Sequence, residues 1–195
     1  QMLGMINRTM RCKSAKSLLP LYKTLVRPHL EYCTVAWSPY YIKDKELLER
    51  VQHRFTRMIP GFSSRTYENR LRDLGLWSLE ERRNRADLVE VFKMWKGLSR
   101  LPFDEFFEVD SQHRTRGHSL KLKRNRCRLD LRQHFFSERV VSSWNGLDQQ
   151  TIDSSSVNVF KKNLTRLRNG KMGRLWTDVR SASWPDLEVT ERTLP

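Results

Sequence analysis

Apolar residues at helical spacing cover most of this chain and constrain its fold more than any other feature. In the segment 14–37, SAKSLLPLYKTLVRPHLEYCTVAW, they recur at intervals of three and four residues, as one face of a helix requires. Those apolar residues are Leu18, Tyr22, Leu25 or Val26, Leu30 and Cys33. Pro28 lacks the N–H group that a helix interior needs, so the pattern predicts a helix that is kinked or broken at that point.

Two further segments before residue 75 show the same spacing and recognisable ends. Residues 44–59 predict a second amphipathic helix that stops at Pro60-Gly61. Its inward-facing side chains are predicted to be Leu47, Leu48, Val51, Phe55 and Met58. A short helix is predicted over residues 66–74, closed by Gly75, because glycine suits the left-handed position after a helix.

A capping box marks the start of a longer helix. Ser78 is followed three residues later by Glu81, and apolar side chains then recur at helical spacing as far as Gly97. Together with the preceding segments, this pattern predicts a helical bundle over residues 1–100.

The period changes after residue 101. The stretches GHSLKLK and CRLDLR alternate apolar and polar residues, with Arg124-Asn125 between them as a turn. Alternation of this kind places successive side chains on opposite faces of a strand, and so predicts a basic β-hairpin. Its inward face is predicted to consist of Leu120, Leu122, Leu129 and Leu131.

Helical spacing returns after the predicted hairpin, first at Phe136, Val140 and Trp144 and then over residues 157–167, after capping-type serines. The predicted fold class is therefore mainly α: a helical bundle followed by a basic β-hairpin and further helices. Residues 1–100 and 101–169 are predicted to form two units, and residues 170–195 a flexible tail.

The chain is strongly basic, with a formal net charge of +15. An excess of this size indicates a polyanionic partner, and nucleic acid is the first candidate. An acidic protein and an anionic membrane surface stay open as alternatives. The charge is densest in residues 114–128, RTRGHSLKLKRNRCR, which contain seven lysines and arginines and no acid.

Two basic clusters are candidate phosphate contacts, since the arginine fork matches phosphate oxygens. The hairpin candidates are Arg114, Arg116, Lys121, Lys123, Arg124, Arg126 and Arg128. A second strip on the first long helix comprises Lys13, Lys16, Lys23 and Arg27, of which Lys16, Lys23 and Arg27 are the candidate contacts. For both clusters the alternative is an ordinary solvated face. Trp37, Tyr40 and Tyr41 can either stack on bases or pack at a helix end.

Signatures of catalysis are not found in this sequence. It has no glycine-rich phosphate loop, and Ala86-Asp87 lacks the second aspartate that two-metal phosphoryl transfer uses. Cys127 with His113, His118 and His134 lacks the paired spacing of a zinc site. The sequence therefore predicts no catalytic residue, no metal and no cofactor.

Cysteine usage and hydropathy bear on the compartment. Three scattered cysteines favour a reducing environment, and no apolar run reaches the roughly 20 residues that span a bilayer. An intracellular protein of the nucleus or cytoplasm, without a membrane partner, is expected.

Five blocks of the chain resemble the region after the palm in LINE-type, non-LTR retrotransposon reverse transcriptases of the jockey and chicken-repeat lineage. The blocks are LYKTLVRPHLEYCTVAWSPY (21–40), LERVQHRFTRMIPG (48–61), YENRLRDLGLWSLEERRNRADLVEVFKMWKGL (67–98), RTRGHSLKLKRNRCRLDLRQHFFSERVVSSWNGL (114–147) and SSSVNVFKKNL (154–164). The resemblance covers about residues 3–167, and the sequence from Gly170 onward does not share it.

The resemblance implies that residues 21–59 belong to a thumb that closes on the template-primer duplex. It implies that the later residues form a C-terminal extension that holds RNA or target DNA. In such proteins the palm, with its paired aspartates, lies upstream. The chain is therefore expected to be a fragment without polymerase activity of its own, with the upstream polymerase domains as a partner.

Two functions follow as hypotheses. The first is a sequence-tolerant nucleic-acid-binding fragment that contacts phosphates of RNA, DNA or a hybrid. The alternative is a protein-interaction module that docks on the polymerase core or on an acidic partner, with its charge steering the encounter.

Overall fold

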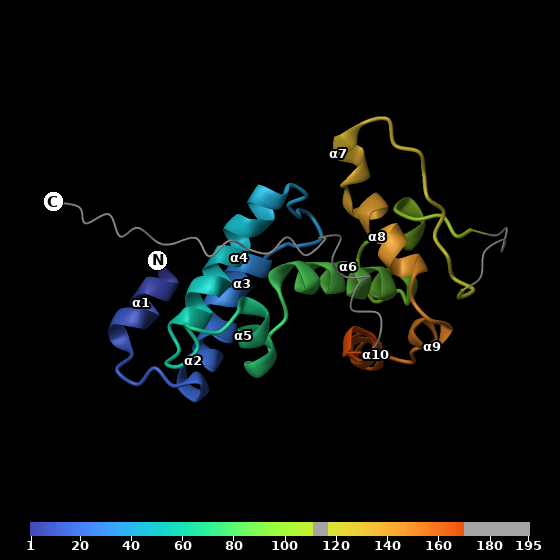
Figure 1. Ribbon diagram of the computed structural model, residues 1–195. Helices are drawn as coiled ribbons and strands as arrows, with labels where there is room; N and C mark the ends of the chain where they lie inside the picture. The colour runs from blue at the N-terminus through green and yellow to red at the C-terminus, as the bar shows by residue number, and fades with distance from the viewer. Residues whose placement is uncertain (111–116, 170–195) are drawn as a thin grey trace.

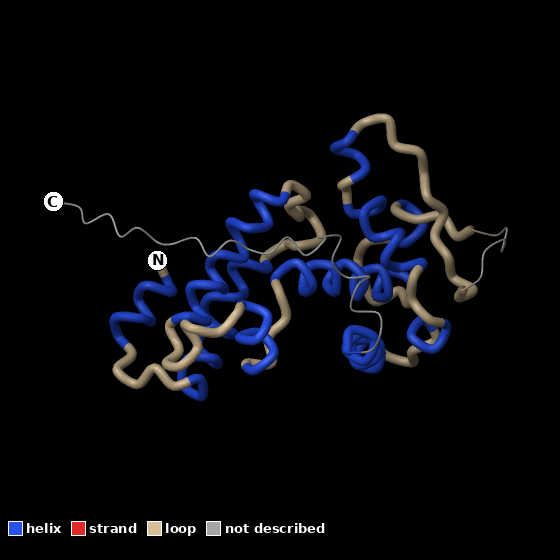
Figure 2. The backbone as a smooth tube through the Cα atoms, in the orientation of Figure 1, coloured by secondary structure: helices blue, strands red, loops and turns tan. Residues whose placement is uncertain are grey.

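The structure, a computed structural model, describes residues 1–110 and 117–169, and within these ranges it is helical (Figures 1 and 2). The elements in chain order are α1 (Met2–Thr9), α2 (Ala15–Leu21), the π-helix η1 (Tyr22–Val26), α3 (Arg27–Glu31), α4 (Ile42–Arg57), α5 (Tyr67–Asp73), α6 (Leu79–Trp95), the 3-10 turn η2 (Phe103–Glu105), α7 (Asp130–Gln133), α8 (Phe136–Asn145), α9 (Gln149–Ile152) and α10 (Val157–Asn169). The mainly α fold class is confirmed. The predicted tail lies outside the described residues.

The helix predicted to be kinked or broken near Pro28 is irregular there but continuous, and the irregularity takes the form of a π-turn. Between α2 and α3 the backbone widens over Tyr22–Val26, so that the N–H of Arg27 donates to the carbonyl of Tyr22, five residues earlier. Pro28 then sits in the first turn of α3, where its missing N–H leaves no intrahelical bond unmade. The irregular turn thus carries the chain past the proline without ending the helical path.

Helices α1 to α5 enclose a first apolar core, centred on Tyr22 and Phe55, whose rings stack with centroids 4.1 Å apart. Phe55 was predicted to face inward and is fully buried. Leu47 was also predicted to face inward, but it is 54 % exposed, and that prediction is wrong. The buried face of α4 instead includes polar residues, among them Glu49 and Gln52.

These two polar residues form a hydrogen-bonded network that joins α4 to its neighbours. The Glu49 carboxylate accepts from the Tyr67 hydroxyl, from Gln52 Nε2 at 3.2 Å and from the Leu79 N–H at 2.9 Å. Gln52 in turn accepts from the Tyr22 hydroxyl at 2.7 Å. The network explains why α4 does not bury its most apolar face. It buries Glu49 and Gln52 instead, because three other elements form hydrogen bonds with their polar groups.

Glu49 gives the network a pH dependence. Burial raises the pKa of this carboxyl from its ordinary 4.5 to about 7. Between those values the folded state retains a proton that the unfolded state has released, so the contribution of Glu49 to stability falls as the pH rises through this window, by about 3 kcal/mol in all. We expect Glu49→Gln to remove this part of the pH dependence, as measured by urea unfolding at pH 5 and pH 8.

The matched control for this variant is Glu46→Gln, on the same helix but only half-buried. It should retain the wild-type difference between pH 5 and pH 8. Equal differences in wild type and Glu49→Gln would contradict the assignment.

Helices α5 and α6 begin and end as their sequence signals predict. The Thr66 hydroxyl caps α5 by accepting from the Asn69 N–H, and Ser78 and Glu81 form a complete capping box at the start of α6. Gly75 and Gly97 follow these helices in the left-handed region, with φ of +59° and +66°. Local capping chemistry therefore marks the boundaries of these two helices, and the start of α6 has a further partner in Glu49, which accepts from the Leu79 N–H.

A second apolar core surrounds Trp144 of α8 and lies between the C-terminal half of α6, α8 and α10. The predicted helices over 136–144 and 157–167 are confirmed as α8 and α10. Trp144 is fully buried, and its indole Nε1 donates to the Leu120 carbonyl at 2.8 Å. His118 Nε2 lies 3.0 Å from the Trp144 carbonyl. These two contacts hold the segment 118–122 against α8.

The predicted basic β-hairpin is wrong. Leu120 and Leu122 are buried as expected, but Leu129 and Leu131 are 71 % and 74 % exposed, and Leu131 lies in the short helix α7. Within the described residues the β pairing is a single antiparallel bridge between Val109 and Leu122.

The backbone around Leu122 explains the absence of the hairpin. On one edge, Asp110 N–H donates to Lys121 O and Lys123 N–H donates to Glu108 O, both at 2.8 Å. On the other edge, the side-chain amide of Asn145 bonds both the N–H and the carbonyl of Leu122, again at 2.8 Å. Because both edges are occupied, the stretch 127–132 has no partner with which to form a hairpin.

A buried ion pair connects the two cores. Arg139 of α8 forms a bidentate pair with Asp87 of α6, at 2.8 and 2.9 Å, and the Asp87 side chain is 4 % exposed. The same guanidinium donates to the carbonyls of Thr34 and Val35, each at 3.0 Å. Arg139 therefore ties the loop after α3 to α6 and α8. It also gives Asp87, considered above for phosphoryl transfer, a structural partner.

Candidate nucleic-acid interface

The arginines of the segment 124–128 lie on a loop between the buried Leu122 and α7. Arg124, Arg126 and Arg128 are exposed, and among the described residues none of the three makes an ion pair with a carboxylate. In this they differ from Arg82, Arg139 and Arg168, which are each bonded to an acid of another element. The three loop arginines are therefore available to an external anion.

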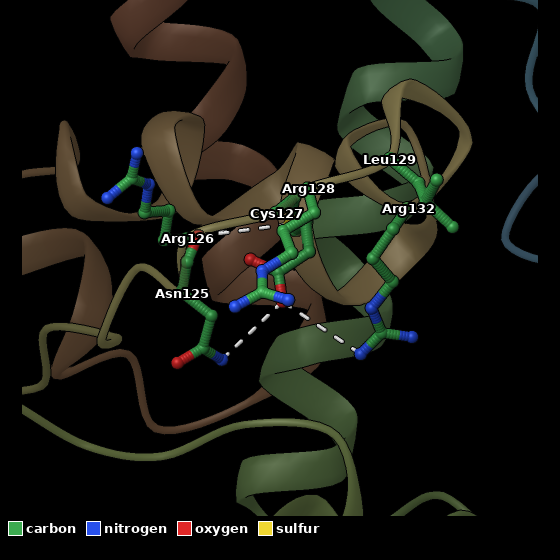
Figure 3. Close-up of a pocket in the computed structure, with 7 residues that line it drawn as sticks. Asn125, Arg126, Cys127, Arg128, Leu129 and Arg132 are labelled. Atoms are coloured by element: carbon green, nitrogen blue, oxygen red, sulfur yellow. Dashed lines mark hydrogen bonds and ion pairs between the residues drawn. The ribbon is translucent and has the colours of Figure 1, made fainter.

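The loop encloses a shallow pocket (Figure 3). The residues that line it are Asn125, Arg126, Cys127, Arg128, Leu129, Arg132 and Glu138. The Glu138 side chain is 6 % exposed, lies 3.9 Å from the Arg132 guanidinium and accepts from Asn125 Nδ2 at 3.5 Å. In Figure 3, Asn125 and Arg132 reach towards the centre of the pocket from opposite sides, whereas Arg126 points away. Glu138 thus holds the loop in place and leaves most of its positive charge facing outward.

The other residues that were predicted to contact phosphate in this cluster differ in their exposure and in their partners. Lys121 is half-buried, and its side chain lies against Gly117. Lys123 is exposed but pairs with Glu108, its Nζ lying 2.8 and 3.0 Å from the two carboxylate oxygens. Exposed pairs of this kind are weak, so Lys123 is only partly neutralised. Arg114 and Arg116 lie outside the described residues.

The predicted strip on the first long helix is not brought together with this loop. Lys16 is exposed and Lys23 is half-buried. Arg27 is half-buried, lies 3.6 Å from Glu31 of the same helix, and has its pKa lowered by burial. In Figure 1, α2 and α7 lie at opposite ends of the molecule. Arg27 is therefore paired within the protein. A phosphate bound by Lys16 would lie away from the arginine loop.

A basic stripe along α4 was missed in the sequence. Lys43, Arg50, Arg54 and Arg57 are exposed at spacings of seven, four and three residues. They therefore lie on one face of the helix, over a length of about 21 Å at 1.5 Å per residue. The signal for this stripe lies in the helical spacing of the charged residues, which the apolar spacing of the same segment does not reveal.

An aromatic stack lies beside both basic surfaces. Tyr40 stacks on His134, with ring centroids 4.2 Å apart and planes 5° from parallel, and Tyr41 lies 4.1 Å from Tyr40 on a plane tilted by 38°. A hydrogen bond with Tyr41 raises the pKa of Tyr40 to about 12. Trp37 is engaged elsewhere, since Arg83 lies 4.1 Å from its ring centroid and its indole N–H donates to the Tyr32 carbonyl.

Metal-ligating side chains are scattered in the described part of the chain. No group of three or more histidine, cysteine or acidic side chains among them could hold a metal ion. Two of the histidines considered for zinc are in protein contacts: His118 is buried against Trp144, and His134 stacks on Tyr40.

No helix in the described ranges is long and apolar enough to cross a membrane.

Comparisons of the chain with protein-family models, with curated proteins and with solved structures give no match.

Proposed function

We propose that this chain is a non-catalytic nucleic-acid-binding segment that holds RNA, DNA or a hybrid through phosphate contacts. The observation that carries the proposal is the exposed loop bearing Arg124, Arg126 and Arg128 without carboxylate partners in the described part of the chain. The net charge of +15 and the stripe along α4 support it, since they extend the positive field beyond one loop.

The sequence resemblance adds a biological setting to this proposal. In that setting the chain is the thumb and C-terminal region of a LINE-type reverse transcriptase, and it grips a template-primer duplex or target nucleic acid while the upstream polymerase domains carry out the chemistry. The proposed mechanism is counterion release and positioning of the strand.

Salt dependence tests the phosphate contacts. In the triple variant Arg124→Ala/Arg126→Ala/Arg128→Ala, the slope of log affinity against log salt should become shallower by about 2.7, because each phosphate contact contributes about 0.9. Fluorescence anisotropy with a labelled duplex, at several salt concentrations, measures the slope.

The control is a triple variant with the same loss of charge at cations paired with acids: Arg65→Ala/Lys93→Ala/Arg166→Ala. These residues pair with Asp73, Glu90 and Asp148. Its slope should change by less than about one. If both variants change the slope equally, the effect is net charge alone and the loop is not the interface.

A second candidate function is docking on another protein. The observation that favours it is a set of exposed apolar side chains near the arginine loop: Ile42, Leu129, Leu131 and Phe135. A partner retained in 1 M salt after nuclease treatment, and lost in Leu129→Asp/Leu131→Asp while the salt slope for nucleic acid is unchanged, would assign these residues to protein docking.

A further inference from the structure

We infer that Tyr41, Tyr40 and His134 form a stacking platform for an unpaired base, so that the interface prefers single-stranded nucleic acid to a duplex. This inference rests on the proposed function and narrows its ligand to a strand with unpaired bases, in preference to a fully paired template-primer duplex. It concerns a different group of residues from those that contact phosphates.

The three rings are arranged before any ligand arrives. Tyr40 and Tyr41 immediately precede α4, whereas His134 follows α7, so the stack joins segments that are far apart in sequence. Tyr40 is covered on both faces by its two neighbours, at centroid distances of 4.1 and 4.2 Å. A stack of three rings with this geometry holds its end ring in a fixed orientation. This lowers the entropic cost of stacking a further ring on it.

Tyr41 is the end ring that a base can reach. Its residue is 52 % exposed, although tyrosine rings carry large apolar faces that burial would stabilise. The Lys43 ammonium lies over the same ring, 5.5 Å from its centroid. Lysine is flexible and strongly hydrated, so this group can move aside for a base and contact the adjoining phosphate.

Cations that could contact phosphates belong to the segments on both sides of the three stacked rings. On one side Lys43 begins the exposed stripe that continues to Arg50 and Arg54. On the other side Arg132 is two residues before His134 and lines the same pocket as Arg126 and Arg128. A strand whose base stacks on Tyr41 would thus have cations along its backbone in both directions.

The platform selects against duplexes because of base stacking itself. In a duplex each base has both faces covered by its neighbours, so it can reach a protein ring only after it is unstacked and unpaired. In a single strand the bases are free to splay and stack on aromatic side chains. The preference therefore depends on the ring of Tyr41, and phosphate contacts alone would not produce it.

The test uses the full chain and three labelled probes: a 12-nucleotide oligo(dT), the same strand with abasic sites throughout its centre, and a 12-base-pair duplex. The variants are Tyr41→Ala, Tyr41→Phe, which keeps the ring, and Leu98→Ala, which shortens an exposed apolar side chain after α6. Circular dichroism and thermal unfolding confirm that each variant is folded.

We expect Tyr41→Ala to bind oligo(dT) roughly five- to 150-fold more weakly, the range that the loss of one stacked base produces. Its affinity for the abasic strand and for the duplex should change less than about twofold, because those probes offer no base to stack. Tyr41→Phe and Leu98→Ala should match wild type on all probes.

Other outcomes separate this inference from the proposed function. If wild type binds oligo(dT) and the abasic strand equally, or if Tyr41→Ala weakens all three probes alike, the stacking platform is overturned while phosphate binding stands. If wild type binds none of the probes at low salt, the proposed function fails, and this inference fails with it.

Discussion

Arg139→Met is expected to lower the free energy of unfolding by about 3–5 kcal/mol. The substitution keeps much of the side-chain volume but leaves the Asp87 carboxylate, 4 % exposed, without its cationic partner. It also leaves the carbonyls of Thr34 and Val35 without their donor. Urea unfolding followed by circular dichroism measures the loss.

Asp87 itself provides the control for this prediction. Burial raises the pKa of the Asp87 carboxyl, and Arg139 opposes that shift. Arg139→Met/Asp87→Leu removes both charges of the pair, so no carboxylate is left buried without Arg139, and the double variant should be more stable than Arg139→Met alone. A double variant that loses the sum of the two single effects would show that the pair is not coupled.

Trp144→Ala is expected to be the most damaging apolar substitution, with a loss of about 3–5 kcal/mol in the free energy of unfolding. Trp144 is fully buried, lies between Phe160 and His118, and donates its only side-chain hydrogen bond to Leu120. Removing the indole opens a cavity in the second core and leaves the Leu120 carbonyl without that donor. Thermal and urea unfolding both report the loss.

Trp95→Ala is the matched control, since Trp95 also lies in a helix but is 43 % exposed. It should lose much less stability than Trp144→Ala. Trp144→Phe, which keeps a ring but not the donor, should fall between the two. If Trp144→Ala and Trp95→Ala lose the same amount, the second core does not depend on Trp144 as described.

The helix boundaries could be predicted because their causes are local. Ser78, Glu81, Gly75 and Gly97 act within a few residues of their own positions, and the structure uses each of them as expected. The β-hairpin could not be excluded in the same way. What prevents it is the Asn145 side chain, which occupies one edge of Leu122 from a helix more than 20 residues away.

The sequence shows which residues carry the charge of the candidate interface, but it shows less of how their side chains are arranged. Arg124, Arg126 and Arg128 stand out as an uncompensated basic run, and the structure leaves them exposed. No local pattern shows that Lys123 pairs with Glu108, because that pairing depends on the backbone bridge between their segments. The contact between Tyr40 and His134 likewise arises only from tertiary packing.

Helix α6 packs against both halves of the protein, and this affects how the protein unfolds. Its first turns are anchored to the N-terminal helices, through the bond from Leu79 N–H to Glu49 and the pair between Arg82 and Glu31. Its last turns supply Val91 and Phe92 to the core around α8. Because α6 is packed into both cores, unfolding of one half would remove contacts of the other, and we expect the two halves to unfold in a single cooperative transition.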